Sequence, residues 1–306
     1  MVDFIVSISN IFIDDILTYD GEIQLNQLGG AGPHALAGCR VWHEQELGLI
    51  ACAGSDFEEF IQYFHTLNID TSAIKFYEEK TTSAWQLFQP GGVRVQIFKY
   101  PKVRVRAADP DFETLEEKYR KAKGYHIIWS GAELVLMKIL ASIRQHNPLT
   151  TIILEPTPQD LNKPPDFFKQ IFQYVDAFSP NTLETKAITG LSEPKKIIEE
   201  YISWGCKNLS LRAGEQGSYF GNAKGELFYV PPAESDIIDQ TGAGNAYVGG
   251  LICGFSTQKS IPESLAMAAV SASFEMQQYG LGYFTPQQIP IRDQRYQKVL
   301  AAIKPL

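Results

Sequence analysis

Short, continuously apolar runs alternate along the chain with longer segments whose apolar residues recur at helical spacing. The apolar runs cover residues 4–8, 47–52, 125–129, 151–154, 175–178 and 208–211. The helical segments cover residues 33–42, 57–67, 112–123, 133–145, 183–189, 194–204, 242–255, 262–278 and 293–303. Runs of the first kind are typical of strands that are buried on both faces. The alternation therefore predicts the α/β class, with a doubly wound, mainly parallel sheet flanked by helices.

Two segments break this alternation, and both are typical of β-hairpins. Residues 16–25 alternate around Asp20-Gly21, and residues 84–100 alternate around Gln89-Pro90-Gly91-Gly92. We therefore expect a single domain over residues 1–306, with β flap insertions at about 16–27 and 83–100. A third hairpin is expected at residues 219–230. Because a small sheet with one apolar, wet face often pairs with a copy of itself, homodimerisation through the flap is a further expectation.

Composition and charge narrow the class of protein. Of the 306 residues, 44% are hydrophobic and 20% are charged, which is typical of a chain that folds around a core. The formal charge of −8 argues against nucleic acid as a partner. No apolar run is long enough to span a membrane, and the first residues lack the basic start of a signal peptide. We therefore expect no membrane partner and a cytoplasmic location.

The cysteines and histidines carry no recognisable metal or disulfide pattern. No pair among Cys39, Cys52, Cys206 and Cys253 has C-x-x-C spacing, and all four lie in apolar surroundings. We expect them to be buried, reduced thiols. The five histidines are scattered without the spacing of paired zinc ligands.

The sharpest chemical signal is a small-residue turn at the start of an apolar helix. A strand-like run at residues 236–238 meets Gly242-Ala243-Gly244-Asn245, which opens that helix. The first backbone amides of a helix are unpaired and lie at the positive end of its dipole, so they suit a phosphate or a developing oxyanion. A tight strand-to-helix turn with nothing bound is the alternative.

The segment 239–250 resembles the C-terminal signature of the ribokinase-like (PfkB) family of carbohydrate and nucleoside kinases, D-T-x-G-A-G-D-x-F-x-G-G. Further motifs of that family occur in order at residues 9–14, 28–35, 49–56, 179–184 and 211–217. The resemblance spans residues 3–280. It implies a ribokinase-like fold that moves a phosphoryl group from ATP to a hydroxyl of a sugar, polyol or nucleoside. It also implies Mg²⁺ and, in some members of the family, K⁺.

The resemblance assigns the substrate to the N-terminal motifs. Asp14 matches the acid that holds substrate hydroxyls, and Gly29 and Gly30 match a Gly-Gly pair that lets the substrate lie against bare backbone. His34 stands where the motif usually has an Asn that faces the substrate. It either contacts a different substrate or is a first-turn helix residue that points to solvent.

The resemblance assigns the nucleotide to later segments. Asn181 and Glu184 fall three residues apart at a helix start, so they share one face and could hold Mg²⁺ through its waters. A helix N-cap with an acid in the first turn is the alternative. The remaining nucleotide residues that the resemblance implies are Arg212, Gly214, Gly217 and Thr241. Asp239 matches an acid that lies near a monovalent cation in some members.

One departure from the family pattern bears directly on activity. Asn245 occupies the position at which the family uses Asp as the base for the attacking hydroxyl. An amide cannot act as that base, and loss of a general base costs about 10²–10⁴ in rate. The chain is then a kinase rescued by water or another acid, a catalytically impaired sensor or regulatory protein that binds nucleotide or sugar, or a product of an engineered substitution. If the site is otherwise intact, Asn245→Asp is expected to raise phosphoryl transfer strongly.

Overall fold

A large, mainly parallel sheet forms the centre of the molecule. The computed structural model describes residues 2–89, 94–100 and 108–306. Within these residues the sheet has eleven strands in the order β15-β14-β13-β12-β11-β10-β9-β1-β4-β5, with β6 also paired to β4. Their bounds are β1 (Val2–Ile8), β4 (Leu47–Gly54), β5 (Ile69–Asp70), β6 (Ile74–Tyr77), β9 (Ala122–Ile128), β10 (Thr151–Glu155), β11 (Ala177–Phe178), β12 (Asn208–Arg212), β13 (Ser218–Asn222), β14 (Leu227–Val230) and β15 (Lys304–Pro305).

Strands β1, β4, β5, β6, β9, β10, β11 and β12 pair in parallel, whereas β13, β14 and β15 add antiparallel strands at one edge. In the central strand, Ile8 pairs with Ile50 of β4 on one side and Ile127 of β9 on the other. Val6 and Ile8 are fully buried, as expected for a strand with helices on both faces. The predicted class, a doubly wound and mainly parallel sheet, is confirmed.

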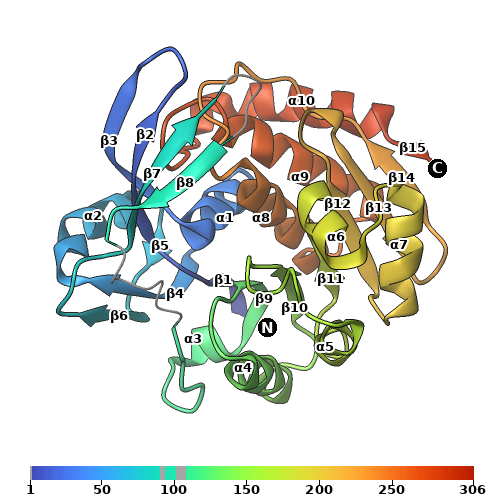
Figure 1. The fold of residues 1–306 in the computed structure, drawn as a ribbon, viewed down its shortest axis with the longest axis horizontal. Helices are drawn as coiled ribbons and strands as arrows, with labels where there is room; N and C mark the ends of the chain where they lie inside the picture. The colour runs from blue at the N-terminus through green and yellow to red at the C-terminus, as the bar shows by residue number, and fades with distance from the viewer. Residues whose placement is uncertain (1, 90–93, 101–107) are drawn as a thin grey trace.

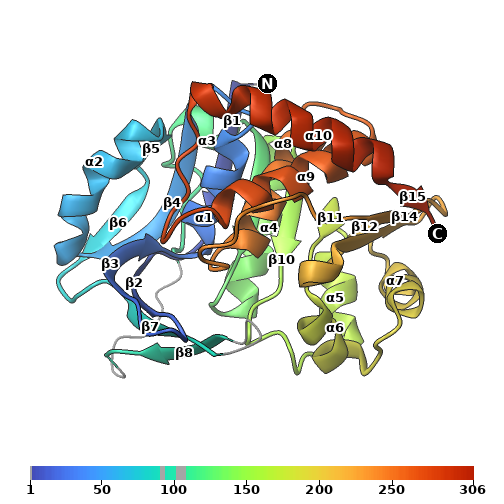
Figure 2. The same ribbon diagram turned by 90° about the horizontal axis from the view of Figure 1, so that it is seen from above.

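Two helical layers cover the sheet and bury separate hydrophobic clusters (Figures 1 and 2). One layer comprises α1 (Ala31–Arg40), α2 (Glu58–Thr66), α8 (Ala243–Ser256), α9 (Ile261–Glu275) and α10 (Ile289–Ala302). The other comprises α3 (Glu117–Arg120), α4 (Glu133–His146), α5 (Pro165–Ile171), α6 (Thr182–Thr189) and α7 (Pro194–Ser203). In the described part of the chain, no helix is both long and apolar enough to cross a membrane.

A second, four-stranded sheet stands to one side of the main sheet (Figure 1). Its order is β3-β2-β7-β8, with β2 and β7 parallel and the other pairs antiparallel. The bounds are β2 (Phe12–Leu17), β3 (Ile23–Gly29), β7 (Ser83–Phe88) and β8 (Arg94–Phe98). We refer to these four strands as the flap. The Pro90-Gly91-Gly92 turn expected between its last two strands lies outside the described residues.

Two local predictions are wrong. The helix expected over residues 112–123 shortens to α3, because the chain from Ala122 onward pairs between β1 and β10 as strand β9. The strand expected at residues 236–238 is an irregular segment, and its Ile237 and Ile238 side chains are exposed. Apolar runs alone cannot distinguish a buried strand from an exposed connection.

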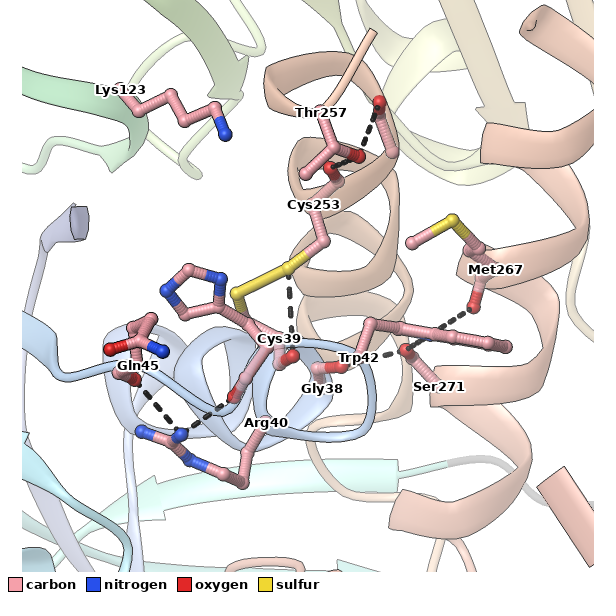
Figure 3. The surroundings of a disulfide bond; sticks show 12 residues. Gly38, Cys39, Arg40, Trp42, Gln45, Lys123, Cys253, Thr257, Met267 and Ser271 are labelled. Carbon is pink, nitrogen blue, oxygen red and sulfur yellow. Dashed lines mark hydrogen bonds between the residues drawn. A yellow bond between two sulfur atoms is a disulfide. The ribbon is translucent and has the colours of Figure 1, made fainter. Parts of the chain in front are cut away.

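The prediction of four reduced thiols is also wrong, because Cys39 of α1 and Cys253 of α8 form a disulfide (Figure 3). The two helices pack backbone to backbone: a Cβ on Gly38 would lie 2.2 Å from the Ala246 carbonyl oxygen. This close packing brings together two cysteines that are 214 residues apart in the sequence. Cys206 remains a buried thiol, and burial raises its pKa to about 12. One argument for a reducing compartment is thereby removed.

Candidate functional site

A cavity of about 1110 Å³ opens where the parallel strands end. The segments that follow β1, β9, β10 and β11 reach it, as does the last residue of β12, and the flap contributes residues from β2, β7 and β8. This is the edge at which doubly wound sheets bind ligands. Ten residues singled out in the sequence line it: Asp14, Gly30, His34, Asn181, Glu184, Arg212, Thr241, Gly242, Gly244 and Asn245.

The start of α8 offers backbone amides to the cavity. Gly242 is the N-cap in the left-handed region, with φ 78°, and no side chain caps the helix. The amide of Ala243 donates to the Gln240 carbonyl, so it is not available to an anion. The amides of Gly244 and Asn245 remain, as for the first turn of any uncapped helix. Two backbone amides of the predicted turn are therefore available to an anion.

Side chains approach closely at two glycines of this turn. A Cβ on Gly242 would lie 2.1 Å from His34 Nδ1, and a Cβ on Gly244 would lie 2.3 Å from Arg212 Nη1. His34 therefore supports the turn from one side and Arg212 from the other. Gly242 and Gly244 therefore leave room for the His34 and Arg212 side chains beside the cavity, in addition to exposing backbone amides.

Asp14 is buried in β2 on the flap side of the cavity. Its Oδ1 accepts a hydrogen bond from Gln86 Nε2 at 2.9 Å, and a Cβ on Gly29 would lie 2.4 Å from its Oδ2. Burial raises the pKa of Asp14 to about 6, although the Gln86 bond and His34 oppose the shift. Oδ2 is left to meet a ligand. Gly30, with φ 103°, turns the chain against Asn10 at the start of α1.

His34 faces the cavity and not the solvent, which excludes one of the two alternatives for this residue. Its Nδ1 is hydrogen-bonded to the buried carboxylate of Glu275. Burial alone would lower the pKa of His34, but Glu275, Asp14 and Asp239 outweigh it and raise the pKa. Among the described residues, His34 Nε2 has no partner. The raised pKa favours the protonated imidazole, in which Nε2–H is available to an acceptor on a ligand.

Asn181 and Glu184 form a reciprocal cap at the start of α6. Asn181 Oδ1 accepts from the Glu184 amide at 2.9 Å, and Glu184 Oε2 accepts from the Asn181 amide at 2.7 Å. These two residues therefore do form the helix N-cap that the sequence left as an alternative to Mg²⁺ binding. Burial raises the pKa of Glu184, and Arg212 at 3.6 Å from its Oε2 opposes that shift. Both residues still line the cavity, and Glu184 Oε1 takes no part in the cap.

Arg212 lies at the end of β12, between the carboxylates of Glu155 and Glu184. Its Nη2 lies 2.9 Å from Glu155 Oε2 and also donates to the Ser179 carbonyl at 2.8 Å. In contrast, Gly214 and Gly217 lie in the turn after β12. Neither glycine is among the described residues that line the cavity. The structure therefore separates Arg212 from these two glycines, which the sequence had grouped together.

Asp239 and Thr241 lie in the turn before α8. The Thr241 amide donates to Asp239 Oδ1 at 2.8 Å. Asp239 Oδ2 and Thr241 Oγ1 are buried and have no hydrogen-bond partner in the described part of the chain. Nowhere in that part do three or more His, Cys, Asp or Glu side chains form a ready-made metal site.

Two acids of the site were missed in the sequence. Glu155 ends β10 and is hydrogen-bonded to Asn245 and His126, and Glu275 near the end of α9 holds His34. Both are buried. The only signal for Glu155 was an acid that closes an apolar strand directly before Pro156. Glu275 is one of two acids in a helix otherwise rich in small residues. Neither signal identifies a partner.

Comparison with known proteins agrees with this geometry. Residues 12–288 match the model of the pfkB family of carbohydrate kinases. The chain is 30% identical to an uncharacterised protein of Schizosaccharomyces pombe, over 92% of this chain and 86% of that protein. It is 26% identical to a cytidine kinase of Thermococcus kodakarensis, over 92% and 98% respectively. An Arabidopsis thaliana ribokinase complexed with ribose and ATP superposes with a TM-score of 0.71 at 19% identity, over 97% of each chain. The chain therefore belongs to the pfkB family of carbohydrate kinases.

Proposed function

We propose that the protein transfers the γ-phosphoryl group of ATP to a hydroxyl of a sugar, polyol or nucleoside. The observation that carries the proposal is a single cavity in which Asp14 and the start of α8 both face the same space. Asp14 accepts hydrogen bonds from substrate hydroxyls, while the Gly244 and Asn245 amides and the Arg212 guanidinium stabilise charge on the transferred phosphoryl group. The cytidine kinase relative and the ribokinase bound to ribose and ATP support a ribose-containing substrate.

The residues fit Mg²⁺ bound through its waters. Glu184 and Asn181 line the cavity beside Arg212, and Glu184 Oε1 takes no part in the cap, so it leaves a carboxylate oxygen for the waters of hydrated Mg²⁺. The ion would neutralise charge on the phosphates. A monovalent cation such as K⁺ fits next to Asp239 Oδ2 and Thr241 Oγ1, two buried oxygens without protein partners among the described residues. It would fix the turn that carries the α8 amides.

Asn245 favours a second candidate, a catalytically impaired sensor or regulatory protein that binds nucleotide, sugar or both in the same cavity. The Asn245 side chain is an amide, so it cannot act as the general base at that position. The first candidate is preferred because a carboxylate, that of Glu155, lies one hydrogen bond away from the Asn245 amide. We further propose a cytoplasmic location because ATP is abundant there, and the Cys39–Cys253 disulfide would be an exception to the reduced thiols usual in that compartment. We also propose homodimerisation through the flap, whose β8 is exposed along its length.

The test is mass spectrometry of products after incubation with Mg-ATP and a defined pool: cytidine, uridine, adenosine, inosine, ribose and fructose. A phosphorylated product that requires the protein supports the kinase. Glu184→Ala should raise the Mg²⁺ concentration needed for half-maximal rate about tenfold. Binding of ATP by calorimetry with no product from any member of the pool would favour the non-catalytic candidate.

A further inference from the structure

Glu155 is a buried carboxylate at the carboxyl end of β10 that lines the cavity next to Asn245. We propose that Glu155 is the general base of the phosphoryl transfer and takes the proton that the Asn245 side chain cannot accept. The inference rests on the proposed function, because a base is needed only if a hydroxyl attacks ATP.

The hydrogen bonds fix which groups face each other. Asn245 Nδ2 donates to Glu155 Oε1 at 2.8 Å. Because a carboxylate only accepts, the amide nitrogen must face Glu155, and the amide oxygen is turned away from it. A hydroxyl that approaches the Asn245 side chain can then donate to the neighbouring carboxylate of Glu155. Asn245 positions Glu155 and leaves its own oxygen for the substrate.

The surroundings keep Glu155 ionised. Burial alone would raise the pKa of Glu155, but Arg212 and His126, together with the Asn245 amide, hold it below its usual range. Arg212 Nη2 lies 2.9 Å from Oε2, and His126 Nε2 lies 2.7 Å from Oε1. Glu155 is therefore deprotonated at neutral pH although it is buried, and a general base must be deprotonated to accept a proton.

A row of buried, hydrogen-bonded side chains extends from Glu155 into the sheet. His126 Nδ1 is hydrogen-bonded to Ser7 Oγ at 2.8 Å, so Ser7, His126 and Glu155 form a row that ends at the cavity. All three side chains are buried. A row of this kind fixes the orientation of the carboxylate.

The step balances without a further reactant. The O–H bond of the attacking hydroxyl breaks and its proton goes to the Glu155 carboxylate. The hydroxyl oxygen forms a bond to the γ-phosphorus, and the bond from that phosphorus to the bridging oxygen breaks, with the electron pair leaving on ADP. Glu155 becomes a neutral acid and loses its proton to solvent after product release.

The test exchanges the amide and the acid. Transfer from radiolabelled ATP to the six-compound pool is measured for the unmodified protein, Glu155→Gln, Asn245→Asp and the double variant Glu155→Gln/Asn245→Asp. We expect Glu155→Gln to lower kcat by about 10²–10⁴, with the Kd for ATP within about threefold. Asn245→Asp alone places two carboxylates 2.8 Å apart, where they share a proton, so its activity should require higher pH. The double variant restores one acid and one amide and should recover activity to within about tenfold.

The control is Asp176→Asn, which removes an acid paired with Arg144. Asp176 lies directly before β11, at the amino end of the strand and away from the cavity, so this variant should leave kcat unchanged. Equal kcat for Glu155→Gln and the unmodified protein would overturn the assignment of Glu155 while the kinase stands. A Glu155→Gln defect cured by excess Mg²⁺, or lost ATP binding that the double variant does not restore, would make Glu155 a metal or structural residue. No transfer by the unmodified protein, despite ATP binding, would overturn the kinase and the base together.

Discussion

The imidazole of His34 and the carboxylate of Glu275 form a buried, hydrogen-bonded pair between α1 and α9, with side chains 3% and 2% exposed, and the carboxylate raises the pKa of the imidazole. Glu275 Oε1 also accepts from the Gly282 amide. Removing one member of a buried pair leaves the other as an uncompensated charge, which costs about 3–5 kcal/mol. We therefore expect His34→Asn, although it restores the residue usual in the family, to lower the free energy of unfolding by that amount in urea titrations.

The double variant His34→Asn/Glu275→Gln removes both charges and should recover at least half of the loss. Lys169→Asn, which breaks the exposed pair between Lys169 and Asp166, serves as the control and should change little. If His34→Asn unfolds at the same urea concentration as the unmodified protein, the pair is not an ion pair in solution.

The raised pKa of Asp14 predicts opposite effects on stability and binding. Its folded value of about 6 exceeds the ordinary 3.8, so the folded state holds the proton more tightly and loses stability as pH rises from about 4 to about 6. Asp14→Asn avoids this loss and should be more stable at pH 7, by about 2–3 kcal/mol. Thermal unfolding at pH 4 and pH 7 measures the difference, which should nearly vanish at pH 4.

The same variant should bind substrate worse, because an ionised acceptor is exchanged for a neutral one. We expect the KM for the phosphorylated member of the pool to rise about 10–100-fold in Asp14→Asn. In the unmodified protein, KM should fall as pH rises through about 6, as Asp14 ionises. A flat pH profile for KM below pH 7 would show that Asp14 does not hold the substrate.

Gly244→Ala should damage activity more than stability. The added Cβ meets the end of the flexible Arg212 side chain at 2.3 Å, so the guanidinium can move aside but leaves Glu155. We expect kcat to fall by about 10²-fold with little change in the midpoint of thermal unfolding. Gly205→Ala should give the reverse pattern: its φ of 96° makes alanine cost about 1 kcal/mol, while no heavy atom lies near the new Cβ.

Reduction of the disulfide should destabilise the protein. The Cys39–Cys253 bond closes a separation of 214 residues, and a native disulfide typically contributes about 2–4 kcal/mol. The intact mass should gain two hydrogens on reduction, and the midpoint of unfolding should drop. In Cys39→Ser/Cys253→Ser, the reductant should have no effect. An unchanged mass would restore the expectation of reduced thiols.

The parts of the fold that depend on local periodicity could be predicted from the sequence. Apolar runs located β1, β4, β10 and β12, because a strand buried on both faces needs apolar residues at every position. The failures lie where tertiary pairing decides. Ala122 and Lys123 continue a helical pattern, yet their backbone joins the sheet. Helix α5 was not expected, although Pro164-Pro165 marks its start.

In the candidate site, too, residues that are close in the sequence could be predicted to lie together, whereas distant pairs could not. Asn181 and Glu184 could be placed at one helix start because three residues separate them. The pairs Asn245–Glu155 and His34–Glu275 join residues 90 and 241 positions apart, and no local pattern encodes them. Their consequence is practical: from the sequence, Asn245→Asp restores a missing base, whereas in the structure it sets two carboxylates against each other.

The covalent and backbone contacts between α1 and α8 determine which part of the molecule can close over a ligand. The starts of these helices hold His34 and the α8 turn, and their last turns are joined through Cys39 and Cys253, so both walls move as a rigid body. We therefore expect any closure over a ligand to come from the flap, which carries Asp14 on its side of the cavity. Ligand capture would then change the distance between Asp14 and the anchored end of α8.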